Sequence, residues 1–375
     1  MGGTNIRTAE NIKILANKTI AVVGWYGKKN FGDELMASRL SQVLSRNGNT
    51  VSIYSDLCAD GVLDGTKDAS YLDQDVIVIG GGGIVTTDFW ALRQPMLEEL
   101  RKSRALIAFL NVNVTPECCE DAEFTSNLRS LNARWWVRDQ MSVEILAGVG
   151  IKAELVPDIS FRVDLDRRDE AEPRSPYRQL SVFANYYTLE GLWENDLDRF
   201  IAAKKSANIL AKYLDWMITF GWRVTFWPAQ TAPFVDDRLA AAAVYAMMKN
   251  KEEATWVTEC PDWKMLVQAV YASDLVVSMR YHTTTTALAN GIPFVDITHH
   301  AKNRRLLAET STSDMAVEFD QLSHHSLVRA TQRAEVMSDD MKAIDAYRAE
   351  AQTRWNKFDL AWDTFTENST RYEAL

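Results

Sequence analysis

Short apolar runs alternate with longer segments of helical periodicity through the first half of the chain. Apolar runs without polar alternation are typical of buried parallel strands, whereas apolar residues three and four positions apart indicate helices. Strands are predicted at Thr19–Val23, Thr50–Tyr54, Asp75–Ile79, Ala105–Leu110 and Arg134–Val137, and helices after Gly32, at Trp90–Arg101 and at Met141–Ala147. Strands and helices in alternation favour a parallel sheet covered on both faces.

The second half repeats this alternation. Its predicted strands are Leu180–Ala184, Arg223–Trp227, Thr255–Val257, Asp274–Ser278 and Phe294–Ile297, and its predicted helices are Asn195–Thr219, Asp236–Lys249 and Trp263–Ala272. A charged, proline-containing stretch between the halves is typical of a linker. We therefore predict an α/β protein with domains at 1–168 and 179–336, a linker at 169–178, and a C-terminal helix within 337–375 that packs back on the body.

Composition and charge exclude several classes of protein. With 375 residues, of which 47% are hydrophobic, the chain can bury two cores. It carries 41 basic and 51 acidic residues, and this net charge of −10 argues against nucleic acid or an anionic membrane as the main partner. No apolar run is long enough to span a membrane, and the N-terminal segment lacks the features of a signal peptide. We expect a cytoplasmic protein, with a peripheral position at the inner membrane face as an alternative.

The cysteines give no sign of a metal site or of a disulfide framework. Cys58, Cys118, Cys119 and Cys260 form no CxxC pair and no metal-like spacing with the histidines. Reduced thiols are therefore expected. The sequence predicts a reaction without a metal or a bound cofactor.

Candidate chemistry is concentrated after the strand Asp274–Ser278, where Arg280 and His282 follow directly. Residues two apart in an extended chain share a face, so both side chains could enter the crevice where open α/β sheets bind ligands. Tyr281 is expected to point the other way, into packing. A helix beginning at Thr283 would add free backbone N–H groups and hydroxyls, which favour an anion.

Other cationic side chains follow neighbouring strands. Arg138 comes after the strand Arg134–Val137, and with Arg280 it could clamp a small dianion. Lys302, preceded by His299 and His300, adds a second cationic edge. The two histidines either contact an acceptor or lie in a solvent-facing loop, and the sequence leaves both alternatives open.

The loop after the first strand is rich in glycine but fits neither GxGxxG nor GxxxxGK[ST]. This spacing argues against a nucleoside-triphosphate P-loop. Asn30, Gly32 and Asp33 lie at the start of the following helix, and Asp33 is either a capping carboxylate or a catalytic base. Four glycines, including Gly81 and Gly82, follow Ile79 and form either an anion-binding nest or a close chain contact.

These stretches together resemble the polysaccharide pyruvyl transferase family. The resemblance extends over about residues 19 to 305 and rests on the first loop, the glycine cluster, Arg138-Asp139 with Ser142, Pro157-Asp158 with Phe161, and Arg280-Tyr281-His282 followed by Gly291-x-Pro293 and Lys302. It implies two Rossmann-like doubly wound domains facing across a cleft, as in GT-B glycosyltransferases. The implied activity transfers the enolpyruvyl group of phosphoenolpyruvate to two sugar hydroxyls, forming a ketal and releasing phosphate.

The resemblance also implies roles for the candidate residues. Arg138 and Arg280 would clamp the carboxylate and phosphate with help from Lys302, His282 would be the general acid, and Asp33 would orient or deprotonate an acceptor hydroxyl. The remaining candidates for substrate binding are Asn30, Gly32, Gly81, Gly82 and Thr283. The partners expected are phosphoenolpyruvate and a saccharide, and whether that saccharide is nucleotide-linked or lipid-linked is left open.

Two rival functions and two departures from the family pattern stand beside this hypothesis. The rivals are a GT-B-like glycosyltransferase that uses a nucleotide sugar and a non-catalytic sugar-binding or anion-binding relative. The chain has Asn111–Pro116 where relatives often carry a glycine-rich loop, and His299-His300 where an aromatic residue is expected before the lysine. Both departures concern the acceptor.

Overall fold

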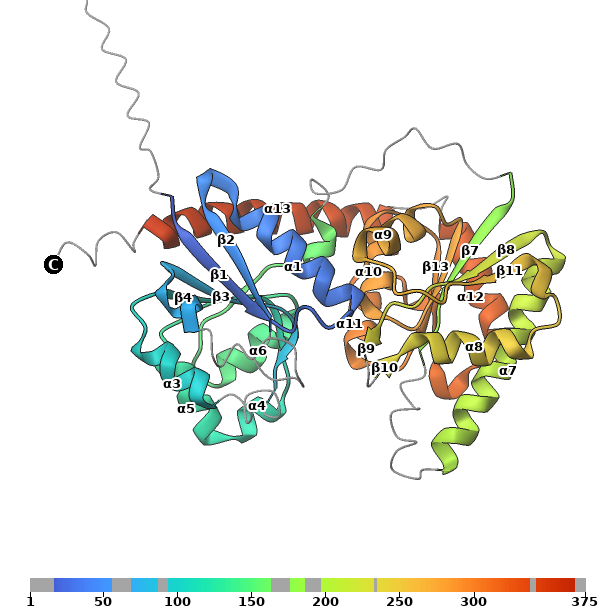
Figure 1. The fold of residues 1–375 in the computed structure, drawn as a ribbon, viewed down its shortest axis with the longest axis horizontal. Coiled ribbons are helices and arrows are strands. Elements are labelled where there is room, and N and C mark those ends of the chain that lie inside the picture. Colours follow the sequence, from blue (N-terminus) through green and yellow to red (C-terminus); the bar gives the residue numbers. More distant parts are fainter. Residues whose placement is uncertain are drawn as a thin grey trace, which may run out of the picture.

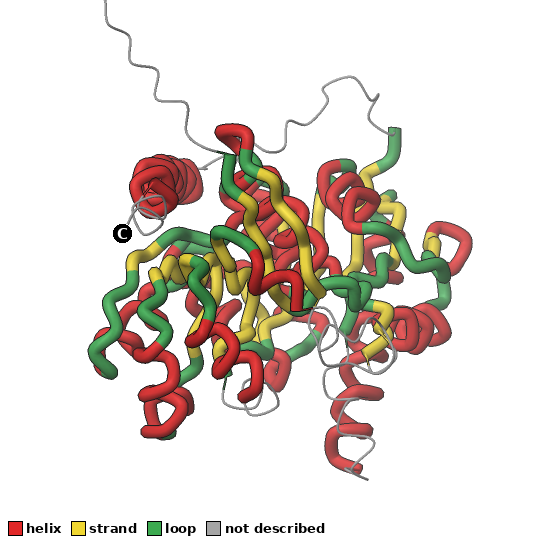
Figure 2. The backbone as a smooth tube through the Cα atoms, turned by 60° about the vertical axis from the view of Figure 1, so that its left-hand side comes forward, coloured by secondary structure: helices red, strands yellow, loops and turns green. Residues whose placement is uncertain are grey.

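The structure, a computed structural model, describes residues 17–55, 69–86, 94–162, 176–185, 197–232, 235–337 and 342–367. Within them the chain forms two six-stranded parallel sheets, each flanked by helices. The two α/β units lie side by side in Figure 1. In the rotated view of Figure 2 the strands form inner layers with helices on either side. The predicted α/β class with two doubly wound domains is therefore confirmed.

The first sheet has the strand order β2-β1-β3-β4-β5-β6. Its strands are β1 (Thr19–Gly24), β2 (Thr50–Ser55), β3 (Val76–Val85), β4 (Leu106–Val114), β5 (Arg134–Val137) and β6 (Glu154–Leu155). The associated helices are α1 (Phe31–Leu44), α3 (Gln94–Lys102), α4 (Glu117–Glu120), α5 (Ala122–Ser130) and α6 (Gln140–Gly148), followed by the 3-10 turn η3 (Ile159–Phe161). Strand order reverses between β1 and β3, and ligands bind open α/β sheets at such a point.

The second sheet has the order β11-β8-β7-β12-β13-β14, which is the order of dinucleotide-binding Rossmann folds. Its strands are β7 (Arg178–Phe183), β8 (Trp222–Phe226), β11 (Ala254–Trp256), β12 (Leu275–Ser278), β13 (Phe294–Thr298) and β14 (Ala316–Glu318), with a separate hairpin of β9 (Thr231–Ala232) and β10 (Val235–Asp236). The helices are α7 (Leu197–Thr219), α8 (Asp237–Met247), α9 (Trp263–Tyr271), α10 (Tyr281–Ala289), α11 (Ala301–Glu309) and α12 (His324–Met337). Here the strand order reverses between β7 and β12.

The last helix, α13 (Lys342–Glu367), runs along both domains (Figure 1). Its N-terminal part contributes Ile344 to the core of the second domain, whereas Trp355 packs in a core of the first. The buried guanidinium of Arg162 donates to both oxygens of Asp359 at 3.0 and 2.9 Å. Because one continuous helix contacts both cores, it limits the relative movement of the domains.

Helix α1 also joins the two domains. Phe31 and Leu35 belong to the core of the second domain, although the helix starts from the first sheet. The N–H of Phe31 donates to the carbonyl of Ala229 at 2.8 Å, and the N–H of Thr231 donates to the carbonyl of Lys29 at 3.1 Å. The first turn of α1 is therefore held against the second domain by backbone hydrogen bonds.

Several sequence predictions need correction. The glycine cluster lies inside β3, which continues to Val85 rather than ending at Ile79. The stretch that begins at Asn111 is the end of β4 rather than a loop. Helix α10 starts at Tyr281, so His282 is helical and not extended. Helices α5, α11 and α12 were not predicted, because their apolar residues are few or widely spaced.

The predicted linker at 169–178 lies largely outside the described residues, and β7 already begins at Arg178. The N-terminal part of the helix predicted at Trp90–Arg101 also lies outside them. Its described part is α3.

Candidate active site between the two domains

The N-terminus of α1 carries one group of predicted site residues. Asn30 is the N-cap, and its side-chain oxygen accepts the N–H of Gly32 at 3.0 Å, which is the usual role of asparagine at this position. The side-chain nitrogen of Asn30 lies 3.5 Å from the side-chain oxygen of Gln230 in the second domain. The structure therefore places Asn30 as a cap and as a contact between domains, with Asp33 in the turn that it caps.

The glycines of β3 allow this turn to approach the first sheet. Gly81 and Gly82 have φ values of 73° and 90°, a region that side-chain-bearing residues rarely adopt. A Cβ on Gly82 would lie 3.3 Å from a carboxylate oxygen of Asp33, and one on Gly81 would lie 3.1 Å from the Cβ of Met36. Of the two interpretations left open by the sequence, close chain contact accounts for both glycines.

Asp158 connects the charged residues of the two domains. It is 2% exposed, and its carboxylate caps η3 by accepting the N–H of Ser160 at 2.9 Å. The same carboxylate lies 3.3 Å from Nη1 of Arg138 and 3.7 Å from Nε2 of His282. Burial raises the pKa of Asp158, but His282 and Arg138 together outweigh it and hold the pKa below its ordinary value. Asp158 thus stays ionised near neutral pH.

Sequence analysis predicts no role for Asp158 beyond its part in the family resemblance. An aspartate that follows a buried stretch in a loop is also a common turn residue, and nothing local distinguishes the two uses. Arg138 is likewise held inside the protein, because the side-chain oxygen of Asn113 accepts a hydrogen bond from its Nη2. The departure at Asn111–Pro116 therefore supplies a direct partner for Arg138.

His282 lies against the first turn of α1. A Cβ on Gly32 would lie 1.9 Å from Nδ1 of His282, so this close approach requires glycine. Burial is the largest influence on the imidazole and lowers its pKa, Asp158 acts in the opposite direction, and Arg138 and Lys302 lower it further. The imidazole therefore faces Gly32 on one side and Asp158 on the other.

Arg280 is paired within the second domain. Its Nε and Nη2 donate to the two carboxylate oxygens of Asp237 at 3.0 and 2.5 Å, and its Nη1 donates to the side chain of Gln230 at 2.8 Å. Asp237 is 1% exposed and also accepts the N–H of Ala229 at 3.1 Å. The sequence analysis assigned the guanidinium of Arg280 to phosphoenolpyruvate. In the structure this guanidinium binds the carboxylate of Asp237 instead.

Thr283 lies in the first turn of α10, fully buried. Its hydroxyl donates to the carbonyl of Arg280 at 2.8 Å and contacts the hydroxyl of Ser278. These bonds hold the turn that connects β12 to α10. The structure accordingly places Thr283 beneath the site and not at its surface.

Tyr281 lies between two cations. The guanidinium of Arg138 is 4.9 Å and the ammonium of Lys302 is 5.3 Å from the centre of its ring. Aromatic rings attract cations at such distances. The predicted packing of Tyr281 is confirmed, because it is buried in the core of the second domain, but it does not point away from the candidate residues, because α10 starts at this residue.

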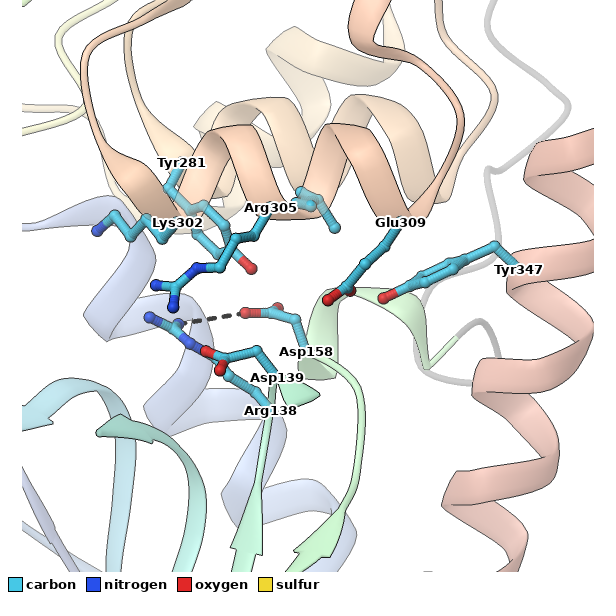
Figure 3. Close-up of a pocket in the computed structure, with 9 residues that line it drawn as sticks. Arg138, Asp139, Asp158, Tyr281, Lys302, Arg305, Glu309 and Tyr347 are labelled. Carbon is cyan, nitrogen blue, oxygen red and sulfur yellow. Dashed lines mark hydrogen bonds and ion pairs between the residues drawn. The ribbon is translucent and has the colours of Figure 1, made fainter. Parts of the chain in front are cut away.

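A small pocket opens beside these residues and is drawn in Figure 3. Its lining comes from both domains and from α13, and comprises Arg138, Asp139, Asp158, Tyr281, Lys302, Arg305, Leu306, Glu309 and Tyr347. Of the predicted site residues, Arg138 and Lys302 line it directly. Nε2 of His282 lies 3.7 Å from the carboxylate of Asp158. Asp33 and Arg280 both lie within electrostatic range of Lys302. Residues that follow strands of both sheets therefore converge at one place.

The model of the family described as "Polysaccharide pyruvyl transferase" matches residues 30–300, which is most of the chain. The chain belongs to the polysaccharide pyruvyl transferase family. No curated protein sequence matches it significantly.

Solved structures similar to this pyruvyl transferase family member share its fold. A protein of Listeria monocytogenes, provisionally assigned as a UDP-N-acetylglucosamine 2-epimerase, has a TM-score of 0.60 at 12% identity over 94% of this chain and 98% of that one. The UDP-GlcNAc 2-epimerase of Methanocaldococcus jannaschii has a TM-score of 0.55 at 10% identity over 84% and 91%. The UDP-GlcNAc 2-epimerase of Neisseria meningitidis gives 0.51 at 11% over 89% and 93%. The GT-B-like arrangement of two domains is therefore shared with sugar-nucleotide enzymes.

In this family member, Asp33 and Lys302 have shifted pKa values. Burial is the largest influence on Asp33 and raises its pKa from 3.8 to about 7, although Lys302, Arg138 and Arg280 act to lower it. Burial, with Arg138 next, lowers the pKa of Lys302 from 10.5 to about 8. Both groups can therefore change protonation state near neutral pH, which is a property of acid–base residues in active sites.

The Asp33→Asn variant of this pyruvyl transferase family member is expected to be more stable than the wild type at pH 8, by about 2 kcal/mol. The pKa of Asp33 is raised from 3.8 to about 7, so across this window the unfolded chain has lost a proton that the folded protein keeps. Stability of the wild type should therefore fall as the pH rises through it. Chemical denaturation at pH 5 and pH 8 measures the free energy of unfolding of both proteins. The same difference between Asp33→Asn and the wild type at the two pH values would contradict the raised pKa of Asp33.

His299 and His300 lie just before α11, with ring centres 4.1 Å apart. Burial lowers their pKa values to about 4 and about 3, respectively. Both side chains are partly buried and lie between β13 and α11, so the solvent-facing alternative holds only in part. Neither is among the residues that line the pocket of Figure 3.

Within the described ranges, no three His, Cys, Asp or Glu side chains come together in a way that could hold a metal ion. None of the helices described has the length and apolar character that crossing a membrane would need.

Proposed function

We propose that this protein transfers the enolpyruvyl group of phosphoenolpyruvate to two hydroxyls of a saccharide, forming a pyruvate ketal and releasing phosphate. The family is one of transferases, and the observation that carries the proposal is the pocket between the domains, where Arg138 and Lys302 meet. Phosphoenolpyruvate is small and multiply anionic. Cations from two domains around a narrow pocket suit such a donor better than a neutral sugar.

The proposed reaction balances without any further reagent. The C2 carbon of phosphoenolpyruvate forms bonds to two acceptor oxygens, and its bond to the phosphate oxygen breaks. The methylene carbon gains one proton and becomes a methyl group. The two acceptor hydroxyls lose two protons in total, of which one is equivalent to the new methyl proton and the other leaves with hydrogen phosphate.

In this proposal His282 supplies the proton to the methylene carbon. Burial lowers the pKa of its imidazole, so the residue needs negative charge nearby to hold a proton. Asp158 supplies one such charge at 3.7 Å, and a bound anionic donor would supply more. A positioned acid typically contributes about 10² to 10⁴ in rate.

Asp33 is the proposed base for an acceptor hydroxyl. Its pKa of about 7 suits a group that must accept a proton near neutral pH and later release it. It comes from the first domain, whereas His282 comes from the second and packs against the same turn of α1. Acid and base would therefore reach the reacting carbon from the two sides of the domain interface.

Binding of phosphoenolpyruvate provides the direct test. Saturation at about 100 times Kd should stabilise the folded wild type by roughly 2.7 kcal/mol, which a thermal-shift titration detects. Lys302→Gln should lose most of this stabilisation, whereas Lys264→Gln, a change at an exposed lysine on α9, should keep it. Phosphate release with candidate saccharides then measures turnover. Stabilisation by nucleotide sugars and not by phosphoenolpyruvate would contradict the proposal and favour a glycosyltransferase.

A further inference from the structure

Arg305 lines the pocket and is cationic, and sequence analysis predicts no role for it. It lies on α11, three positions after Lys302 and hence on nearly the same side of the helix. Both side chains line the pocket, together with Arg138 from the first domain. Helix α11 is not predicted from the sequence, so the relation between the two positions is known only from the fold.

Arg138 and Arg280 have carboxylate partners, whereas Arg305 has no ion pair with any residue that the structure describes. Arg138 is paired with Asp158, and Arg280 is paired with Asp237. Among the described residues, no carboxylate lies within ion-pair distance of Arg305, and its Nε atom is buried without a hydrogen-bond partner. Its guanidinium contacts the sulfur of Met141 and, against the larger effect of burial, lowers the pKa of Glu309, four positions further along α11. A partly buried charge of this kind is costly unless something neutralises it.

The direction of the side chain suggests what that neutralising group is. In Figure 3 the guanidinium of Arg305 lies next to the guanidinium of Arg138, which is the group joined to the carboxylate of Asp158. Asp158 already serves Arg138 and His282, and the carboxylate of Asp139 accepts the N–H of Ser142 at the start of α6. The three cations Arg138, Lys302 and Arg305 therefore outnumber the two carboxylates at this end. The lowered pKa of Lys302, to which Arg138 contributes, is consistent with this excess.

The opposite end of the pocket has a different character. Glu309 and Tyr347 face each other there (Figure 3). A carboxylate at that end repels an anion, whereas a tyrosine hydroxyl and a carboxylate can both bond to neutral hydroxyl groups. The pocket therefore has a cationic end at Arg305 and a polar end that suits uncharged groups.

We propose that Arg305 binds the phosphate group of the donor, with Lys302 and Arg138 completing the site. This inference rests on the proposed function, because it assigns one end of the phosphoenolpyruvate molecule. A guanidinium can donate two parallel hydrogen bonds to a phosphate, which a lysine cannot do. Arg280 has a different role in this scheme, since Asp237 occupies its guanidinium and makes it a positioning residue.

The test compares Arg305→Gln with Arg304→Gln. Arg304 is the neighbouring arginine of the same helix, is largely exposed and pairs with Glu318 at 2.6 Å, so it is a matched control. Isothermal titration of each variant with phosphoenolpyruvate and with inorganic phosphate gives two dissociation constants. Arg305→Gln is expected to weaken both about tenfold to hundredfold, as loss of charged hydrogen bonds predicts. Arg304→Gln should bind both ligands like the wild type.

The stability of the ligand-free variant separates binding from a structural role. Because Arg305 lacks a carboxylate partner, Arg305→Gln should unfold at the same temperature as the wild type or a higher one. Arg305→Lys keeps the charge and loses the paired donors, so its affinities should fall between those of the wild type and Arg305→Gln.

The possible outcomes also distinguish the inference from the proposed function. Wild-type affinities in Arg305→Gln would overturn the assignment of Arg305 and leave the donor proposal intact. Binding of phosphate that depends on Arg305, together with no binding of phosphoenolpyruvate, would support an anion site and contradict the donor. A wild type that binds neither ligand would overturn both.

Discussion

His282→Ala is expected to lower kcat by roughly 10² to 10⁴-fold while the dissociation constant for phosphoenolpyruvate stays close to that of the wild type. The imidazole lies 3.7 Å from Asp158, which lines the anion pocket, and packs against Gly32. It does not itself line the pocket. Its removal should therefore take away the proton donor without removing a ligand of the phosphate. Initial rates of phosphate release and titration calorimetry measure the two quantities separately.

The control for this variant is His325→Ala, since His325 is an exposed histidine on α12, outside the site. It should have wild-type turnover. The pH profile adds a second readout, because the wild-type rate should fall as pH rises through the lowered pKa of His282, and this fall should be absent from the residual rate of His282→Ala. Turnover of His282→Ala at the wild-type rate would remove the assignment of this residue as the acid.

Arg280→Gln is expected to destabilise the protein by about 3 kcal/mol, because it leaves the buried carboxylate of Asp237 without its charge partner. Burial already raises the pKa of Asp237, and Arg280 is the main influence in the opposite direction. Without Arg280 the pKa should rise further, so the loss of stability should be larger at pH 7.5 than at pH 5. Urea denaturation at the two pH values measures both effects.

A double-mutant cycle separates the ion pair from other effects of the substitution. Asp237→Asn/Arg280→Gln removes both charges and should be more stable than Arg280→Gln alone, since no unpaired charge remains. Arg238→Gln is the matched control, because its pair with Asp236 is at the surface and typically contributes no more than about 1 kcal/mol. Equal stability of Arg280→Gln and the wild type would show that the pair has no net effect.

Substitution of Arg280 is also expected to affect the proposed donor site. The pair with Asp237 is joined through Gln230 to Asn30, the N-cap of the helix that carries Asp33. We therefore expect any loss of activity in Arg280→Gln to accompany a disturbed domain interface. Activity that returns in Asp237→Asn/Arg280→Gln would identify Arg280 as a positioning residue.

The sequence by itself determined the architecture of both domains. Buried parallel strands consist of nearly continuous apolar runs, which can be recognised in a sequence. The observed bounds of three strands lie within a residue or two of the predicted ones, at Thr50–Ser55, Arg134–Val137 and Phe294–Thr298. The sequence also places Asp33 at the start of a helix that follows a strand, because this position depends on local pattern alone. The family could be inferred because its motifs occur in order along the chain.

Only the tertiary structure decided which charges are paired. Asp158 lies 20 positions from Arg138, and Asp237 lies 43 positions from Arg280, so no local pattern connects the partners. Helix α11 has few apolar residues, and without it Arg305 has no defined relation to Lys302. The charge that remains available to a ligand depends on such long-range pairing, because Asp237 neutralises Arg280, whereas Asp158 is shared between Arg138 and His282.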